Sequence, residues 1–215
     1  MAYQYRGCEL IPVVSPIPEP ANFDADCRQR GRQWLAGHPD ADRPRDFWSS
    51  FRDDLREGFQ RRCGYRAMHL EDGSIDHFLS WDKTRATLPN LAYEWDNFRF
   101  ITSSLNSSKK NRDDQLLDPF EIEDGWFEVD IPSFILRITS RLPLPLRAKA
   151  EFTLRHLKLE GGRRAVALRW EWYEQHRLGE LNLAGLWRHA PLVAQAVEEW
   201  QSAGRGSLPE VPRPA

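Results

Sequence analysis

An aspartate and a histidine stand next to each other at Asp76 and His77, and two asparagines follow at Asn97 and Asn106. Histidine is largely neutral near pH 7 and can accept a proton from water, whereas carboxylate and amide oxygens bind hard cations such as Mg2+. Hydrolysis of a phosphodiester requires a base, a cation to neutralise the developing charge, and ligands that leave this cation partly open. These residue types therefore indicate metal-assisted hydrolysis.

The position of the pair in its strand matters, because Asp76 and His77 would point to opposite faces of a regular strand. Both can face one cation only where the strand ends or bends, and the segment before the long loop from 80 to 92 is such a place. An isolated Asp-His pair would otherwise be a solvated loop or a capping interaction, and Asn97 alone could be a turn residue. These residues indicate a metal site only if the surrounding strands and helices bring them together.

A basic segment follows Asn106. Lys109 would lie one turn further along a helix and could meet a phosphate, together with Lys110 and Arg112. The other interpretation is a solvated helix face, because two aspartates follow directly and offset the charge.

The elements expected around these residues form a strand, a second strand and a helix. Residues 65–70 and 75–79 alternate around a turn at 71–74, which is typical of a hairpin, and residues 93–105 lead into a helix at 106–112. Helices are expected at 23–35, ending at Gly37, and at 44–62, with a strand at 126–131 and a connector at 132–145. Three further helical stretches are expected near 147–159, 162–178 and 182–203, the last interrupted at Pro191.

Four strings together resemble the HNH endonuclease family in its H-N-N variant: Cys63-Gly64-Tyr65, Asp76-His77-Phe78, Tyr93-Glu94-Trp95-Asp96-Asn97 and Asn106-Ser107-Ser108-Lys109. The resemblance implies that His77 is the general base, that Asp76 and Asn106 are the metal ligands, and that Asn97 fixes the loop presenting His77. Lys109 matches a lysine common three residues after the last ligand. The nine-residue step between the asparagines fits the family.

The resemblance also implies a fold and an activity. We expect an α+β protein with a small ββα-metal core wrapped by N- and C-terminal helices, which holds one Mg2+ or Mn2+ and cuts DNA, with RNA as the alternative substrate. Residues 117–120 and Arg169-Trp170 resemble the bacterial subgroup found beside an ATPase in phage-defence operons. A partner ATPase is therefore expected, and the alternative is a catalytically silent or latent nucleic-acid-binding subunit.

One departure from the family concerns zinc. Many relatives brace this unit with four cysteines, but the corresponding positions here hold Cys63, Arg66, Thr102 and Leu105. One thiol cannot hold a tetrahedral zinc, so we expect no structural zinc. Packing should replace it, from four aromatic residues: Trp81, Trp95, Phe98 and Phe100.

Composition sets the remaining limits. The chain of 215 residues has a formal net charge of -2, so any surface that binds phosphate must be local. The first twenty residues lack the pattern of a signal peptide and the three cysteines form no pair motif, so a cytoplasmic location is expected. The expected parts are an extended arm at 1–21, a helical segment at 22–62, the catalytic core at 63–112, a mostly helical region at 113–203 and a flexible tail at 204–215.

Overall fold

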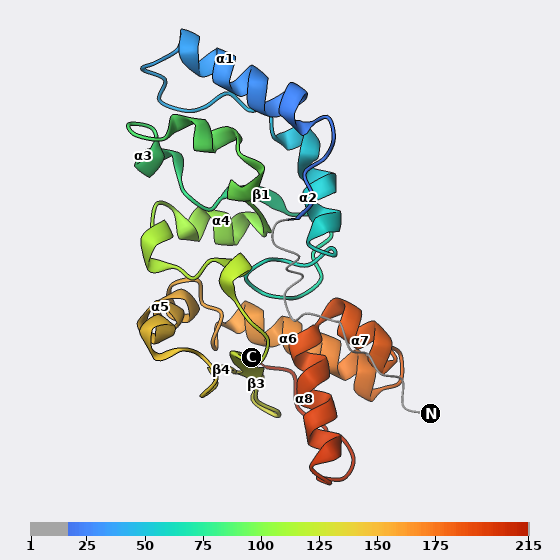
Figure 1. Ribbon diagram of the computed structural model, residues 1–215. Helices are drawn as coiled ribbons and strands as arrows, with labels where there is room; N and C mark the ends of the chain where they lie inside the picture. The colour runs from blue at the N-terminus through green and yellow to red at the C-terminus, as the bar shows by residue number, and fades with distance from the viewer. Residues whose placement is uncertain (1–16, 215) are drawn as a thin grey trace.

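The protein has a mixed α+β fold with two small antiparallel sheets (Figure 1), seen in a computed structural model that describes residues 17–214. Most of the arm expected at 1–21, including Cys8, lies outside the described residues. The N-terminal helices stand at one end of the molecule and the C-terminal helices at the other, with helix α4 between them.

The first N-terminal helix forms where the sequence predicted it, whereas the second covers only part of the predicted range 44–62. The first consists of η1 (Asp24–Gln29) continued by α1 (Arg30–Gly37), and the second of η2 (Ser49–Phe51) continued by α2 (Arg52–Gly58). The apolar residues of the second helix recur four apart and are buried because they share one face: Phe51, Leu55 and Phe59.

The central unit is built from two strands and one helix. Strand β1 (Ser74–His77) pairs antiparallel with β2 (Phe98–Ile101), with Asp76 opposite Arg99. The chain then enters α4 (Ser103–Lys109), whose N-cap Thr102 accepts a hydrogen bond from the Leu105 backbone N–H. Between the strands lie three short helices: α3 (Trp81–Thr84), η3 (Pro89–Tyr93) and η4 (Trp95–Asn97).

The predicted hairpin of 65–70 with 75–79 is wrong. Residues 63–68 instead form a tight turn, in which the Cys63 N–H donates to Met68 O and the Ala67 N–H donates to Cys63 O. Only an isolated bridge, between Arg62 and His69, remains of the first predicted strand. The partner of β1 comes from more than twenty residues further along the chain, a pairing that local alternation does not reveal.

The C-terminal half begins with a second sheet, in which β3 (Phe127–Val129) pairs antiparallel with β4 (Leu136–Ile138). The expected connector at 132–145 therefore contains a strand. Four helices follow, near the predicted positions: α5 (Arg147–His156), α6 (Arg163–Arg177), α7 (Leu183–His189) and α8 (Pro191–Ser202). Three short 3-10 helices complete this half: η5 (Asp113–Gln115), η6 (Pro119–Glu121) and η7 (Leu144–Leu146).

The tail after α8 has no regular element, but it contacts α6. The Trp170 Nε1–H donates to Val211 O at 2.7 Å and the Tyr173 hydroxyl donates to Pro209 O at 2.7 Å. In the described part of the chain, no helix combines the length and the apolar character needed to cross a membrane.

Two hydrophobic clusters hold the molecule together, and β2 lies at their boundary. Phe98 and Phe100 pack with the N-terminal helices, whereas Ile101 packs with the C-terminal half. The central unit thus packs against the N-terminal helices on one side and against the C-terminal half on the other.

Candidate functional site

Helix α4 lies against β1, and this contact brings three of the predicted site residues together. The Asn106 side-chain amide donates to Ile75 O at 3.3 Å and to Ser74 Oγ at 3.4 Å. One turn later, Lys109 Nζ donates to Asp76 Oδ1 at 3.2 Å. Asp76, Asn106 and Lys109 therefore share one side of the strand.

Lys109 forms a buried cluster of charged side chains with Asp76 and Asp113. Its ammonium also donates to the backbone carbonyls of His77 and Phe78, at 2.7 and 2.9 Å, and to Asp113 Oδ1 at 3.4 Å. The side chains of Lys109 and Asp113 are each 1% exposed and that of Asp76 is 5% exposed. The Ser80 N–H donates to Asp113 Oδ2 at 2.6 Å, so the cluster fixes the chain that leaves β1.

The cluster contains two carboxylates and one ammonium. Burial raises the pKa of Asp76 to about 6, although Lys109 acts in the opposite direction. Asp76 Oδ2 is buried and has no hydrogen-bond partner. An unpaired buried carboxylate oxygen is costly, which makes this atom the natural point for an added positive group.

His77 faces a different environment from Asp76. Its Nε2–H donates to Ala92 O at 2.9 Å, and its ring makes edge contacts with Trp48 and Phe98 at centroid distances of 4.6 and 5.1 Å. Because a carbonyl only accepts, Nε2 carries the proton in the neutral ring and Nδ1 carries the lone pair. Burial lowers the pKa of His77 to about 4, so the ring is neutral at pH 7.

The contacts show that Asp76 and His77 lie on opposite faces of β1. The strand ends at His77 as expected, but this end does not turn both side chains toward one cation. The His77 ring also contributes packing. An alanine at this position would remove aromatic contacts as well as a base.

Asn97 ties two segments of the loop together. The Leu79 N–H donates to Asn97 Oδ1 at 2.7 Å, and Asn97 Nδ2 donates to Leu79 O and Leu91 O at 3.1 and 2.9 Å. Leu91 O lies beside Ala92, whose carbonyl holds His77. Asn97 thus fixes both the exit from β1 and the helix η3 that orients the histidine.

The three cations expected to bind nucleic acid differ in exposure. Lys109 is buried and saturated by the contacts described above, so its ammonium is not presented to an external phosphate. Lys110 is exposed, and Arg112 is exposed with its guanidinium near Gln115 and the ring of Phe152. The physical reason for the burial of Lys109 is its partnership with two carboxylates.

Sequence reasoning missed Asp113, which it treated as surface charge. The spacing of four residues from Lys109 was the available signal, because such residues meet on a helical path. It also missed the buried bidentate pair of Arg99 with Asp118, in which Arg99 Nε donates to Asp118 Oδ1 at 2.7 Å. Arg99 stands opposite Asp76 in the sheet and adds positive potential there.

The positions of the family's zinc ligands meet around Cys63. Its thiol is buried beside the backbone N–H groups of Arg66 and Thr102, and Leu105 belongs to the same hydrophobic cluster. Burial raises the pKa of this thiol. The aromatic residues expected to replace the zinc, Trp95, Phe98 and Phe100, pack instead in the N-terminal cluster. Cys63 instead packs in the C-terminal cluster, which also contains Tyr65, Met68 and Leu105.

The oxygens able to hold a cation are those of Asp76 and Asn106. Asn106 Oδ1 accepts no hydrogen bond from any described residue, and its side chain is only partly buried. Within residues 17–214, no three His, Cys, Asp or Glu side chains are grouped to bind a metal. A site here would use one carboxylate and one amide, with the remaining ligands from water or substrate.

Comparisons of the chain with protein families, with curated proteins and with solved structures find no match.

Proposed function

We propose that the protein is a metal-dependent HNH endonuclease that hydrolyses DNA, with β1, β2 and α4 as its ββα-metal core. The support comes from the sequence resemblance together with the contacts of Asp76, His77, Asn97 and Asn106. A cytoplasmic role in phage defence belongs to the same proposal and rests on the resemblance alone.

Asp76 and Asn106 would hold the ion, Mg2+ or Mn2+. The observation that carries this assignment is the buried Asp76 Oδ2 without a partner, on the side of β1 where Asn106 packs. Hard cations of this kind prefer oxygen ligands, and the donor set is one carboxylate and one amide oxygen. When bound, the ion would supply positive charge to stabilise the charge that develops on the phosphate and the leaving oxygen.

His77 would act as general base through Nδ1. Its Nε2–H is held by Ala92 O, which fixes the tautomer and leaves the Nδ1 lone pair to accept a proton from water. Burial keeps the ring neutral, and Asn97 holds both segments that position it. This role explains why an amide at Asn97 bonds three backbone groups of one loop.

The test is nicking of supercoiled plasmid by the purified protein in Mg2+ or Mn2+, with His77→Gln as the main variant. Glutamine fills much of the space beside Trp48 and its amide can still donate to Ala92 O, so the fold is kept while the base is lost. We expect a rate loss of about 100-fold to 10,000-fold. His38→Gln, at an exposed histidine outside the site, is the matched control and should cut at the wild-type rate. Cutting by His77→Gln at the wild-type rate would contradict the assignment.

A latent or catalytically silent subunit is the second candidate, and one contact favours it. The Lys109 ammonium lies 3.2 Å from Asp76 Oδ1 and competes with a metal for that carboxylate. A partner, such as an ATPase, could then be required to shift α4. Saturable Mn2+ binding measured by calorimetry without plasmid nicking would favour this candidate over an autonomous nuclease.

A further inference from the structure

A pocket on the side of α4 that faces away from β1 is lined by basic side chains without acidic partners. It has a volume of about 350 Å³ and is lined by four basic residues, Arg66, Lys158, Arg163 and Arg164. Ser104 and Ser108 of α4 and Gly162 also line it, and no acidic residue does. Among the described residues, none of the four basic side chains forms an ion pair or a hydrogen bond. This separates them from arginines such as Arg28, Arg99 and Arg177, which pair with carboxylates.

The least exposed of these cations is Arg66. Its Nε is buried and has no hydrogen-bond partner. Burial lowers the pKa of Arg66, and the positive charge of Arg164 lowers it further. A cluster of like charges is held together here without an internal anion, although such an arrangement is destabilising until an anion binds.

A fifth cation, Arg169, lies close enough to Arg66 for their charges to interact, although it does not line the pocket. Arg169 is 2% exposed and donates to Phe134 O at 2.8 Å, to Glu160 O at 3.0 Å and to Leu159 O. These bonds hold the turn that leads from α5 into α6. They also leave the guanidinium charge of Arg169 without a carboxylate, directly under the segment that carries Lys158 and Arg163.

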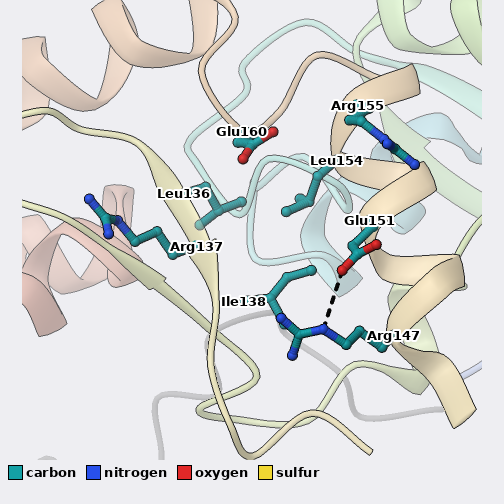
Figure 2. Close-up of a pocket in the computed structure, with 8 residues that line it drawn as sticks. All are labelled: Leu136, Arg137, Ile138, Arg147, Glu151, Leu154, Arg155 and Glu160. Carbon is teal, nitrogen blue, oxygen red and sulfur yellow. Dashed lines mark hydrogen bonds and ion pairs between the residues drawn. The ribbon is translucent and has the colours of Figure 1, made fainter. Parts of the chain in front are cut away.

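A neighbouring hollow gives a useful contrast. Figure 2 shows that Arg147 and Glu151, both on α5, pair with each other in the hollow between α5 and β4, which Glu160 also lines. The acidic side chains there offset the arginines. The pocket beside α4 has no such compensation, which makes it the stronger anion site.

We propose that this pocket binds a backbone phosphate of the DNA that the nuclease site cuts. The inference rests on the proposed function and extends it by naming where the strand is held. Asn106 faces β1, and Ser104 and Ser108 lie on the other side of the same helix, so the two sites are separated by about 10 Å, the diameter of one helix. A strand that passes over α4 can reach both sites. Free mononucleotides share this phosphate chemistry and form one arm of the test.

The experiment measures binding rather than cutting, so it does not depend on catalysis. Fluorescence anisotropy of a labelled DNA duplex is followed in EDTA, on the His77→Gln background, over a series of salt concentrations. The test variant is Lys158→Gln with Arg163→Gln and Arg164→Gln, three exposed positions. Glutamine keeps the helix propensity at 163 and 164 in the first turn of α6, and Lys158 lies in the turn before this helix. The control removes the same charge at three exposed arginines outside the pocket that form no ion pair: Arg43→Gln, Arg188→Gln and Arg205→Gln.

We expect the pocket variant to bind DNA at least about tenfold more weakly than the parent near 0.1 M salt. The magnitude of the slope of log K against log salt should fall by about one to two, because each lost phosphate contact contributes about 0.9. The control should change affinity less than about twofold, within the nonspecific effect of net charge. Equal losses in both variants, or no loss in the pocket variant, would overturn the proposal. ATP binding that is lost in the pocket variant while DNA binding is unchanged would also overturn it. If DNA binds through the pocket but the wild-type protein does not nick plasmid in Mg2+ or Mn2+, the nuclease assignment is refuted and the pocket proposal stands.

Discussion

Replacing Asp76 with asparagine should stabilise the metal-free protein while abolishing its activity. Burial raises the pKa of Asp76 from 3.8 to about 6, so the folded protein favours the neutral carboxyl and is penalised by the charged one. At 1.36 kcal/mol per pKa unit, this shift corresponds to about 3 kcal/mol at pH 7.5. This value already includes the opposing attraction of Lys109, and the neutral amide of asparagine resembles the neutral carboxyl. We therefore expect a net gain of about 3 kcal/mol in the free energy of unfolding.

The dependence on pH follows from the direction of the shift. The protonated carboxyl of Asp76 favours the fold below pH 3.8, and this contribution is lost as the pH rises through about 6. The advantage of the asparagine variant should therefore be largest at pH 7.5 and fall to about half at pH 5. Protonation of His77 affects wild type and variant alike and cancels in the difference.

Thermal unfolding in EDTA at pH 7.5 and pH 5 is the assay. For a chain of this size, a gain of about 3 kcal/mol raises the melting temperature by about 6 to 12 °C. Asp82→Asn, at an exposed carboxylate of α3, is the control and should stay within about 0.5 kcal/mol of wild type. A melting temperature of Asp76→Asn at or below wild type at pH 7.5 would refute the reasoning, as would a gain that is equal at both pH values.

Two further predictions concern metals. Asn106→Ala should raise the metal concentration needed for half-maximal nicking, because it removes a proposed ligand. Asn97→Ala should lower the rate without changing this concentration, because it misplaces His77. If a metal titration gives unchanged midpoints in both variants, Asn106 is not a ligand. Treatment with a zinc chelator should leave the melting temperature unchanged, because only Cys63 remains of the four family zinc ligands; a stoichiometric zinc in the purified protein, with a large drop in melting temperature on its removal, would contradict this.

Local patterns in the sequence predicted the helices well. The four-residue spacing of Phe51, Leu55 and Phe59 and the interruption at Pro191 are properties of single segments, and the structure has the corresponding helices. The predicted hairpin failed for the opposite reason. The partner of β1 is chosen by contacts between distant segments, and Phe98 and Phe100 pair with it because their side chains fill the N-terminal cluster.

The candidate site was predictable only in part. Spacing was enough to single out Asp76, His77, Asn97 and Asn106, but the state of each group depends on neighbours that spacing does not show. Lys109 looked like a surface cation, since its contact with Asp76 spans 33 positions of the chain. The tautomer of His77 likewise depends on the carbonyl of a loop residue, fifteen positions away.

The basic pocket gives the C-terminal half a role that a ββα unit alone would not explain. Arg66 comes from the turn before β1, whereas Lys158, Arg163 and Arg164 come from the junction of α5 and α6, about a hundred residues later. Only the packing of the C-terminal helices against α4 brings these charges together. With a net charge of -2, the chain cannot attract DNA by bulk charge, so such a local concentration of cations is what binding requires. Because α4 carries Asn106 on one side and lines the pocket on the other, any displacement of this helix would change metal binding and strand binding together.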